Sequence, residues 1–485
     1  MSVWFHRFAI VLVCIVLALP AAPAAAQQPP APTPYTPPSG SGLPVIPAVP
    51  AVPTIGRGQS LSLTDAVATA LQKNYVIQQA ALQVALDRAT LAQAEAGLWP
   101  TVQYKASYTQ QTAGNPQTLP IQGNITISGV PTPFSTTITL PGSQTPAYAT
   151  SFALTYPLYT GNALQDQVTI AQQKVAADQA AFAAQAATIV LQARQAYYNV
   201  EAAAALAASG QRAVDASREN VRVTQAQVTV GTSPQFNLLQ AQTQLASALQ
   251  TLAQQKAAAV QAQYTLAIVL NLPQATIVTP ATPLGLPNPP QDLNTLIQMA
   301  LRQRPELQQA RANIAGAQAA IDLAKAGLRP NITVSGGPFI QTNNLSSSPP
   351  VDWTGTIALT LTIFDGGLTK SKVQAAQVQL QQAQVSEQQT EQSVESQVRT
   401  SYLNLQQAAE QLVAAEAGLV SAREQLRIAN VRFQAGVGTQ LEVVTAIQNL
   451  ASADSSVIAA EYNYNLALAQ IDQAVGTQVQ VPNRP

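Results

Sequence analysis

The stretch that decides the fold of this chain is FQAGVGTQLEVVTAIQNL (433–450), where two glycines interrupt a sequence with helical spacing. The same layout occurs 205 residues earlier, in QVTVGTSPQFNLLQAQTQL (227–245). Gly231 in 227–245 aligns with Gly436 in 433–450, and the alignment needs no gap. A break that recurs at a fixed distance indicates a duplicated architecture rather than a defect in one helix.

The duplication extends over most of the chain. LSLTDAVATALQKN (61–74) is matched by DLNTLIQMALRQRPEL (292–307), AEAGLWPTVQYKASY (94–108) by AKAGLRPNITVSGG (324–337), and FALTYPLYTGNALQDQ (152–167) by IALTLTIFDGGLTKSK (357–372). The offset falls from 230 to 205 between the last two pairs, so the first repeat has a longer loop, which holds the turn formers of 114–134. We expect each repeat to contain a helix of about 35 residues, two short strands, a helix of nearly 70, a glycine break and a helix of about 37.

The long helices carry a heptad repeat. A helix over 367–435 would extend about 100 Å, which no single globular core accommodates without neighbouring helices. Apolar residues stand seven apart in one file, with an alanine file three residues on, whereas the first repeat keeps the register more loosely. These files are Val398, Leu405, Leu412, Leu419, Leu426 and Phe433; Ala408, Ala415, Ala422 and Ala429; and Val200, Ala207, Val214, Val221 and Val228. Sustained heptads predict left-handed coiled-coil packing.

Four short stretches alternate apolar with polar or small residues: 100–112, 148–159, 330–341 and 354–364. This pattern fits strands of a membrane β-barrel and equally fits half-buried soluble strands. Four strands cannot close a barrel in lipid, where open edges are not tolerated, but three copies would supply twelve. We therefore predict an α+β membrane protein of two tandem repeats. Its trimer would have a 12-stranded β-barrel, continued by a long coiled-coil α-helical barrel.

The ends of the chain and its composition restrict its class. Residues 1–26 resemble a signal peptide, 27–58 a Pro-rich linker, 276–290 an inter-repeat linker and 477–485 a tail, which leaves 59–275 and 291–476 as the repeats. Cys14 and His6, the chain's one cysteine and one histidine, leave with the signal, although Cys14 as a lipid-attachment site is an alternative. We expect no enzyme activity, metal site or cofactor. The net charge of zero argues against a nucleic-acid partner.

The glycine breaks are expected where each long helix reverses, at the membrane-distal end, in tips over 230–234 and 435–439. Glycine tolerates the left-handed conformation that ends helices. The return helices begin with caps: Thr439 and Glu442 form a capping box, and Ser233 offers an N-cap with Pro234 at N1. Both tips are therefore predicted to be tight helical hairpins.

In the order and duplication of these elements, the chain resembles the TolC family of outer membrane factors, the exit ducts of bacterial efflux and type I secretion systems. The resemblance rests on LSLTDAVATALQKN, the two AGL-x-P strand entries, LTYPLYTG, IFDGGLTKSK and the two tips, and covers about 61–476. It implies a homotrimer in the outer membrane lipid with a periplasmic helical tunnel. It also implies an equatorial region that includes 273–290 and the tail.

The resemblance implies that the tips close the tunnel and dock a periplasmic adaptor protein that is tied to an inner-membrane transporter. The adaptor-docking positions are Val230, Gly231, Thr232, Gly436, Val437, Gly438 and Thr439, and the gate positions are Phe433, Glu442, Thr445 and Asn237. Only Glu442 keeps a charge among the positions that correspond to the family's gate contacts, so an ionic latch is not expected. Three Glu442 carboxylates could form a cation-binding ring, or Glu442 could simply complete its cap. Phe433 fits coiled-coil packing better than a gate plug.

The predicted function is a passive exit duct of a tripartite efflux or type I secretion system. The alternative is a periplasmic coiled-coil scaffold or adhesin without a pore. Lys370 and Lys372 have two interpretations, the lower boundary of the barrel or, more simply, a solvated helix face.

Overall fold

The computed structural model describes residues 59–111, 117–127, 130–140, 145–273, 278–280, 292–342 and 349–477, which all belong to one compact unit. The predicted signal peptide and the Pro-rich linker lie outside the described residues. Most of the predicted inter-repeat linker and of the C-terminal tail lie outside them as well.

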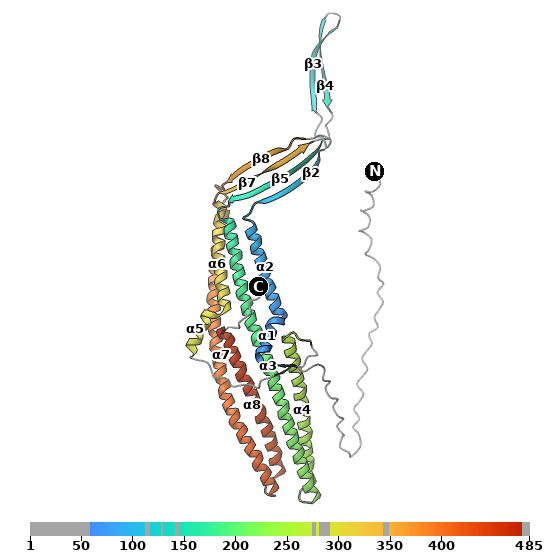
Figure 1. Cartoon of the computed structure of the whole chain (residues 1–485), viewed down its shortest axis with the longest axis vertical. Helices are drawn as coiled ribbons and strands as arrows, with labels where there is room; N and C mark the ends of the chain where they lie inside the picture. The colour runs from blue at the N-terminus through green and yellow to red at the C-terminus, as the bar shows by residue number, and fades with distance from the viewer. Residues whose placement is uncertain are drawn as a thin grey trace, which may run out of the picture. The chain divides into compact units, whose positions relative to one another are not determined.

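Both halves of the chain follow one order of elements (Figure 1). The first half contains β1 (Gln59–Leu61), α1 (Leu63–Lys73), α2 (Tyr75–Ala96), β2 (Thr101–Gln111), β3 (Gln117–Ile127), β4 (Val130–Leu140), β5 (Thr145–Tyr159), α3 (Ala163–Thr229) and α4 (Gln235–Val269). After β6 (Val278–Pro280), the second contains α5 (Leu293–Gln303), α6 (Pro305–Lys325), η1 (Ala326–Leu328), β7 (Asn331–Thr342), β8 (Asp352–Thr360), α7 (Leu368–Gln434) and α8 (Gln440–Val475). The predicted long helices α3 and α7 have 67 residues each, and the return helices α4 and α8 have 35 and 36, which confirms this part of the prediction.

The single helix of about 35 residues expected at the start of each repeat is wrong, because each is two helices. In the first repeat, Asn74 ends α1 in an extended conformation and its side chain accepts from the Val76 amide at 2.9 Å, so it caps α2. In the second repeat, Arg304 is extended and Pro305 starts α6. A residue before proline disfavours helical dihedrals, so the break follows from the sequence.

The long loop of the first repeat is also different from the expectation, because β3 and β4 form an antiparallel hairpin in which Gly123 pairs with Phe134. Isoleucine is frequent in β3 and threonine in β4, and their preference for extended backbone outweighs the turn-forming glycines and prolines on which the prediction relied. The other predicted strands are present, but β8 ends at Thr360 rather than at 364.

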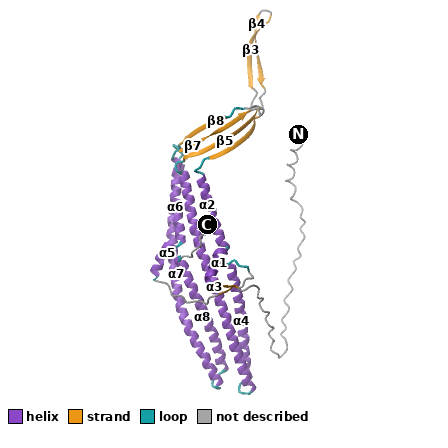
Figure 2. Ribbon diagram, viewed as in Figure 1, coloured by secondary structure: helices purple, strands orange, loops and turns teal. Residues whose placement is uncertain are grey.

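The main sheet has four antiparallel strands in the order β2-β5-β7-β8 (Figure 2). Its register pairs the apolar residues of neighbouring strands with one another. Val102 lies opposite Leu154, Tyr156 opposite Val334, and Ile332 opposite Leu359. Side chains of one parity share a face, so the sheet has one apolar face. Most large side chains on that face are exposed within this chain.

The helices pack in pairs with duplicated cores. Helix α3 contacts α2, α4, α6 and α8, and α7 contacts α6 and α8. One core joins α1, α3 and α4, and the other joins α5, α7 and α8. Equivalent positions are buried in both, such as Val200 with Leu405 and Leu266 with Ile471, 205 residues apart. The duplication seen in the sequence is therefore a duplication of packing.

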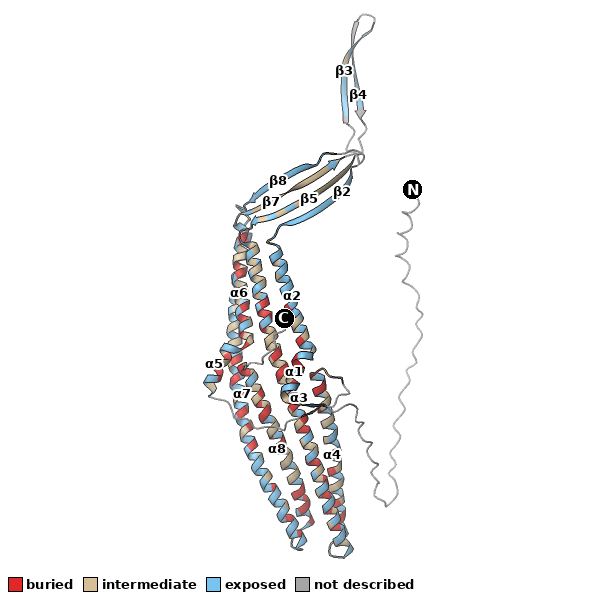
Figure 3. Ribbon diagram, in the orientation of Figure 1, coloured by how far each residue is buried: buried red, intermediate tan, exposed pale blue. Residues whose placement is uncertain are grey.

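The heptad prediction for α7 is confirmed in its main features (Figure 3). Val398, Leu405, Leu412 and Phe433 are buried, and Leu419 and Leu426 are half-buried. Of the alanine file, Ala408, Ala422 and Ala429 are buried. Separately, none of the described helices combines the length and the hydropathy needed to span a membrane.

Candidate functional site: the hairpin tips and the groove between them

The two tips end their long helices in the same way. Gly231 and Gly436 both have φ of 75°, the left-handed region that glycine adopts without strain. The Thr232 amide donates to the Gln227 carbonyl at 2.9 Å, and the Val437 amide donates to the Arg432 carbonyl at 3.0 Å. These are the bonds of a Schellman motif, which satisfies carbonyls at a helix end. The predicted reversals at both glycines are confirmed.

Gly438 is required for a different reason. Its φ is not in the left-handed region, but a Cβ at this position would lie 2.9 Å from the Arg432 carbonyl carbon and 2.9 Å from the Phe433 amide nitrogen. Its amide donates to the Arg432 carbonyl at 2.9 Å. The second tip therefore folds its loop directly against the backbone of α7, and only a residue without a side chain fits.

The expected caps have different outcomes. Thr439 is the N-cap of α8, and its hydroxyl accepts from the Glu442 amide at 3.3 Å, which confirms one half of the predicted capping box. In the first tip, Pro234 is the N-cap rather than N1, because it keeps an extended ψ of 151° and α4 begins one residue later. Ser233 does not cap the backbone. Its hydroxyl accepts from the Asn237 side-chain amide at 3.0 Å.

Glu442 has a basic partner within its own hairpin, which the sequence reasoning did not identify. Its Oε2 lies 3.3 Å from Nε of Arg432, at the end of α7 in the same hairpin. The guanidinium also donates to the Val437 carbonyl at 3.4 Å. The hairpin brings position 432 back against position 442, a proximity that residues ten apart in sequence do not reveal. The carboxylate thus pairs within its own tip.

The remaining predicted gate and docking residues are placed as follows. Phe433 is buried among Ala429, Val443, Ala446 and Ile447, which confirms its role in packing. Thr445 is exposed on α8, and Asn237 is half-buried on α4. Val230, Thr232 and Val437 are exposed beside the glycines. The structure therefore gathers the predicted docking residues into two tips, and it places Asn237 with Ser233 in the first.

Two tip residues escaped the sequence reasoning. Phe236 is 72 % exposed in the first turn of α4, and Leu441 is 60 % exposed in the first turn of α8. They are 205 residues apart and therefore equivalent in the repeats. Large apolar side chains held in water at the same place of both repeats indicate a contact surface. The repeat alignment contained this signal, because both positions are apolar just after the break.

A groove separates the two hairpins above the tips. One part of it, of about 170 Å³, lies between α3 and the α7–α8 pair and is lined by Asn220, Val223, Phe433 and Ile447 among others. Asn220 is buried, and its side-chain Nδ2 has no hydrogen-bond partner. Further along, a hollow of about 200 Å³ continues between Ala216 and Ile447. A buried donor without a partner is costly, so Asn220 is a locally unfavourable feature of the groove lining.

An ion cluster joins the hairpins beside this groove. Asp454 of α8 accepts from Ser209 at 3.1 Å and from Arg212 at 3.0 Å, both on α3, and Arg423 of α7 lies 3.8 Å away. The carboxylate is largely buried, while the two guanidinium groups are exposed. In the described ranges, no group of three or more histidine, cysteine, aspartate or glutamate side chains is arranged to hold a metal ion.

The duplicated fold, with its amphipathic sheet and paired helical hairpins, defines the class of the outer-membrane channels. The structural alignment with the solved structure of CusC covers 86 % of this chain and 92 % of that one, with a TM-score of 0.72 and 21 % identity. The open-state outer membrane channel MtrE of Neisseria gonorrhoeae has a TM-score of 0.70 and 20 % identity, over 85 % of this chain and 88 % of that one. At this identity, the likeness shows the fold.

Residues 66–272 and 296–477 match the family described as outer membrane efflux protein, and the chain belongs to this family. The cation efflux system protein CusC of Escherichia coli strain K12 is 26 % identical over 259 residues, which are 52 % of this chain and 56 % of that protein. The chain thus spans about half the length of the curated relatives it matches. Family membership confirms the resemblance found in the sequence and the outer-membrane location.

Proposed function

We propose that three copies of this chain assemble into a passive exit duct of a tripartite efflux system. A periplasmic adaptor and an inner-membrane transporter would complete it. One observation carries the proposal. This member of the family combines an amphipathic sheet with two matched helical hairpins, and the tips of both hairpins expose apolar side chains.

The sheet supports the trimer. Among the described strands, the outer strands β2 and β8 of this sheet each pair on one side only. Free strand edges are not tolerated in lipid, so the edge of β2 in one copy needs a partner such as β8 of the next. Three sheets of four strands supply twelve, within the size range of closed membrane barrels. Head-to-tail pairing of this kind produces cyclic symmetry.

The tips and the groove support adaptor docking. Val230, Phe236, Val437 and Leu441 are exposed apolar residues at the tips. The groove beside them is lined by polar and apolar side chains, Asn220 and Val223 among them. An α-helical hairpin of an adaptor could place apolar side chains on the tips and a polar one in the groove, which is the helix-in-groove mode of recognition.

The gate belongs to the same proposal. Three copies of Phe433, Glu442, Thr445 and Asn237 would surround the axis near the tips. Because Arg432 holds Glu442 within one hairpin, the ring is a set of paired charges and not of bare carboxylates. The relative CusC is named as a cation efflux protein, which makes metal cations the first cargo to test. Type I secretion of polypeptides is the second.

Purified protein in planar bilayers tests the duct. We expect a trimer in detergent and steady ion conductance. Absence of conductance under all conditions, from a protein that remains a periplasmic monomer, would favour the scaffold alternative. Deletion of the gene followed by growth on metals, drugs and detergents identifies the cargo class.

A further inference from the structure

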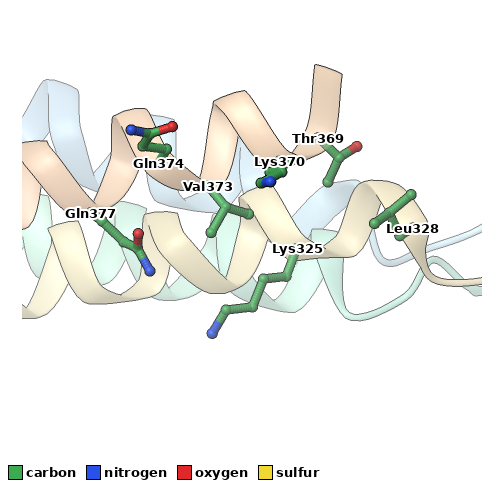
Figure 4. Close-up of a pocket in the computed structure, with 7 residues that line it drawn as sticks. All are labelled: Lys325, Leu328, Thr369, Lys370, Val373, Gln374 and Gln377. Atoms are coloured by element: carbon green, nitrogen blue, oxygen red, sulfur yellow. The ribbon is translucent and has the colours of Figure 1, made fainter. Parts of the chain in front are cut away.

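We propose that a groove at the sheet-proximal end of α6 and α7 binds the phosphate-bearing headgroup of an anionic membrane phospholipid. The groove has a volume of about 520 Å³ and is lined by Lys325 and Leu328 from the end of α6 and η1, and by Thr369, Lys370, Val373, Gln374 and Gln377 from the first turns of α7 (Figure 4). This inference rests on the outer-membrane placement of the sheet.

The two lysines give the groove its charge. Lys325 lies on one wall and Lys370 on the other (Figure 4). Lys325 forms an exposed pair with Asp322 at 3.0 Å, while Lys370 has no ion pair among the described residues. An exposed pair of this kind contributes little, so both ammonium groups can turn to an external anion. Thr369 also lines the groove, but its side chain is buried and bonds the Asp365 carboxylate.

The N-terminus of α7 is not part of this site, because the chain already occupies it. Asp365 accepts from the Gly367 amide at 3.0 Å and from the Thr369 amide at 2.7 Å. The carboxylate therefore satisfies the free amides of the helix end. An anion in the groove would meet the lysine side chains instead.

Apolar side chains at the same junction indicate a lipid rather than a soluble anion. Ile363 is 90 % exposed and Phe364 is 86 % exposed in the segment between β8 and α7, and Leu368 and Leu328 are exposed as well. Exposing apolar side chains of this size to water is unfavourable in free energy, and contact with acyl chains removes this penalty. Lysines beside such residues can extend toward the headgroup level while their methylene stems stay on the apolar surface.

The internal repeat provides a comparison within the same molecule. At the 230-residue and 205-residue offsets, Lys325 corresponds to Glu95, and Lys370 corresponds to Gln165. Lys372 likewise corresponds to Gln167. The fold is the same at both junctions, so the fold does not require these lysines. The positive charge at the second junction is a specialisation of that repeat, which a shared structural role does not explain.

The experiment compares lipids on the full-length protein in neutral detergent. Short-chain phosphatidylglycerol and phosphatidylcholine are titrated, and bound lipid is counted by native mass spectrometry. We expect phosphatidylglycerol to bind about tenfold more tightly, as attraction of two lysines to an anionic lipid predicts. The double variant Lys325→Gln, Lys370→Gln should lose this preference. A matched double variant of exposed lysines elsewhere, Lys73→Gln with Lys256→Gln, should keep it.

Two outcomes would overturn the proposal. The first is an unchanged lipid preference in the Lys325 and Lys370 double variant. The second is displacement of the lipid by millimolar inorganic phosphate, which would show a site for a soluble anion. Conductance of the same double variant is measured in parallel. A variant that conducts normally but has lost the lipid preference separates this site from the duct, and a wild-type protein that binds the lipid without conducting contradicts the proposed function alone.

Discussion

At the residue scale, the glycines of the tips have separate physical roles. Gly231 and Gly436 supply a left-handed backbone in open space, where an added Cβ would meet nothing within 4 Å. Gly438 supplies room for a close approach of two backbone segments. The sequence showed that all of them belong to a reversal. It did not show which glycines are required for a left-handed backbone and which for lack of room for a side chain.

Proline at either left-handed glycine should abolish export while leaving trimer assembly intact. Proline fixes φ near −65°, far from the 75° of Gly231 and Gly436, so the tip must change shape. The measurement is cargo export together with the oligomeric state in detergent. Gly418→Ala, at an exposed mid-helix position with open space around it, is the control and should export normally. Normal export by both proline variants would show that the tips do not dock the adaptor.

The Thr439 cap should be measurable on its own. Thr439→Ala removes the hydroxyl that accepts from the Glu442 amide, so the first turn of α8 should open more easily by about 1 kcal/mol. Hydrogen exchange of the amides near 440–444 measures this free energy of opening. Thr439→Ser keeps the acceptor and should behave as the wild type. Equal exchange in the alanine variant would mean that the Arg432–Glu442 pair, rather than the cap, holds this turn.

At the element scale, the heptad file of α7 determines how it packs on α8. Leu405 is buried in the core shared by α5, α7 and α8, whereas Leu403, two residues earlier, points away. At about 3.5 residues per turn, residues two apart lie on nearly opposite faces of the helix. The sequence was sufficient to identify the buried file, because the pattern continues for many turns.

Leu405→Ala should lower the free energy of unfolding of the helical part by about 2–5 kcal/mol, because it leaves a cavity in this core. Leu403→Ala, at a side chain that is 62 % exposed, is the matched control and should change it by less than about 0.5 kcal/mol. Urea unfolding of both variants in detergent, at one protein concentration and followed by circular dichroism, compares the two. Equal losses in both variants would contradict the assigned register.

At the scale of the whole molecule, polar contacts join the two repeats along α3 and α8. Besides Asp454, the Arg194 guanidinium on α3 lies 2.7 Å from the Asp472 carboxylate on α8. On the same helix as Arg194, the Glu201 carboxyl has an oxygen that is buried without a hydrogen-bond partner. Burial raises the pKa of Glu201 to about 7. This group therefore carries a proton under conditions where an exposed glutamate does not.

Stability should fall as the pH rises across this range. Between the ordinary glutamate pKa of 4.5 and about 7, the folded chain keeps the Glu201 proton that the unfolded chain has lost, so raising the pH favours unfolding. Below 4.5 and above about 7, this group adds no further slope. Thermal midpoints at pH 5 and pH 8 measure the effect. Glu201→Gln should remove this part of the difference, and an unchanged difference would assign the slope to other groups.

The sequence by itself determined the duplication, the lengths of the long helices, the buried heptad file, the four strands of the main sheet and the two reversal points. Each of these follows from a local residue pattern or from the similarity between the two halves of the chain, and the linear sequence contains both. The tertiary structure alone decided the Arg432–Glu442 pair, the Asp454 cluster, the groove with Asn220 and the crowding at Gly438. Those features depend on which side chains meet when a hairpin closes or two repeats pack, and such distances are set by the fold rather than by spacing in sequence.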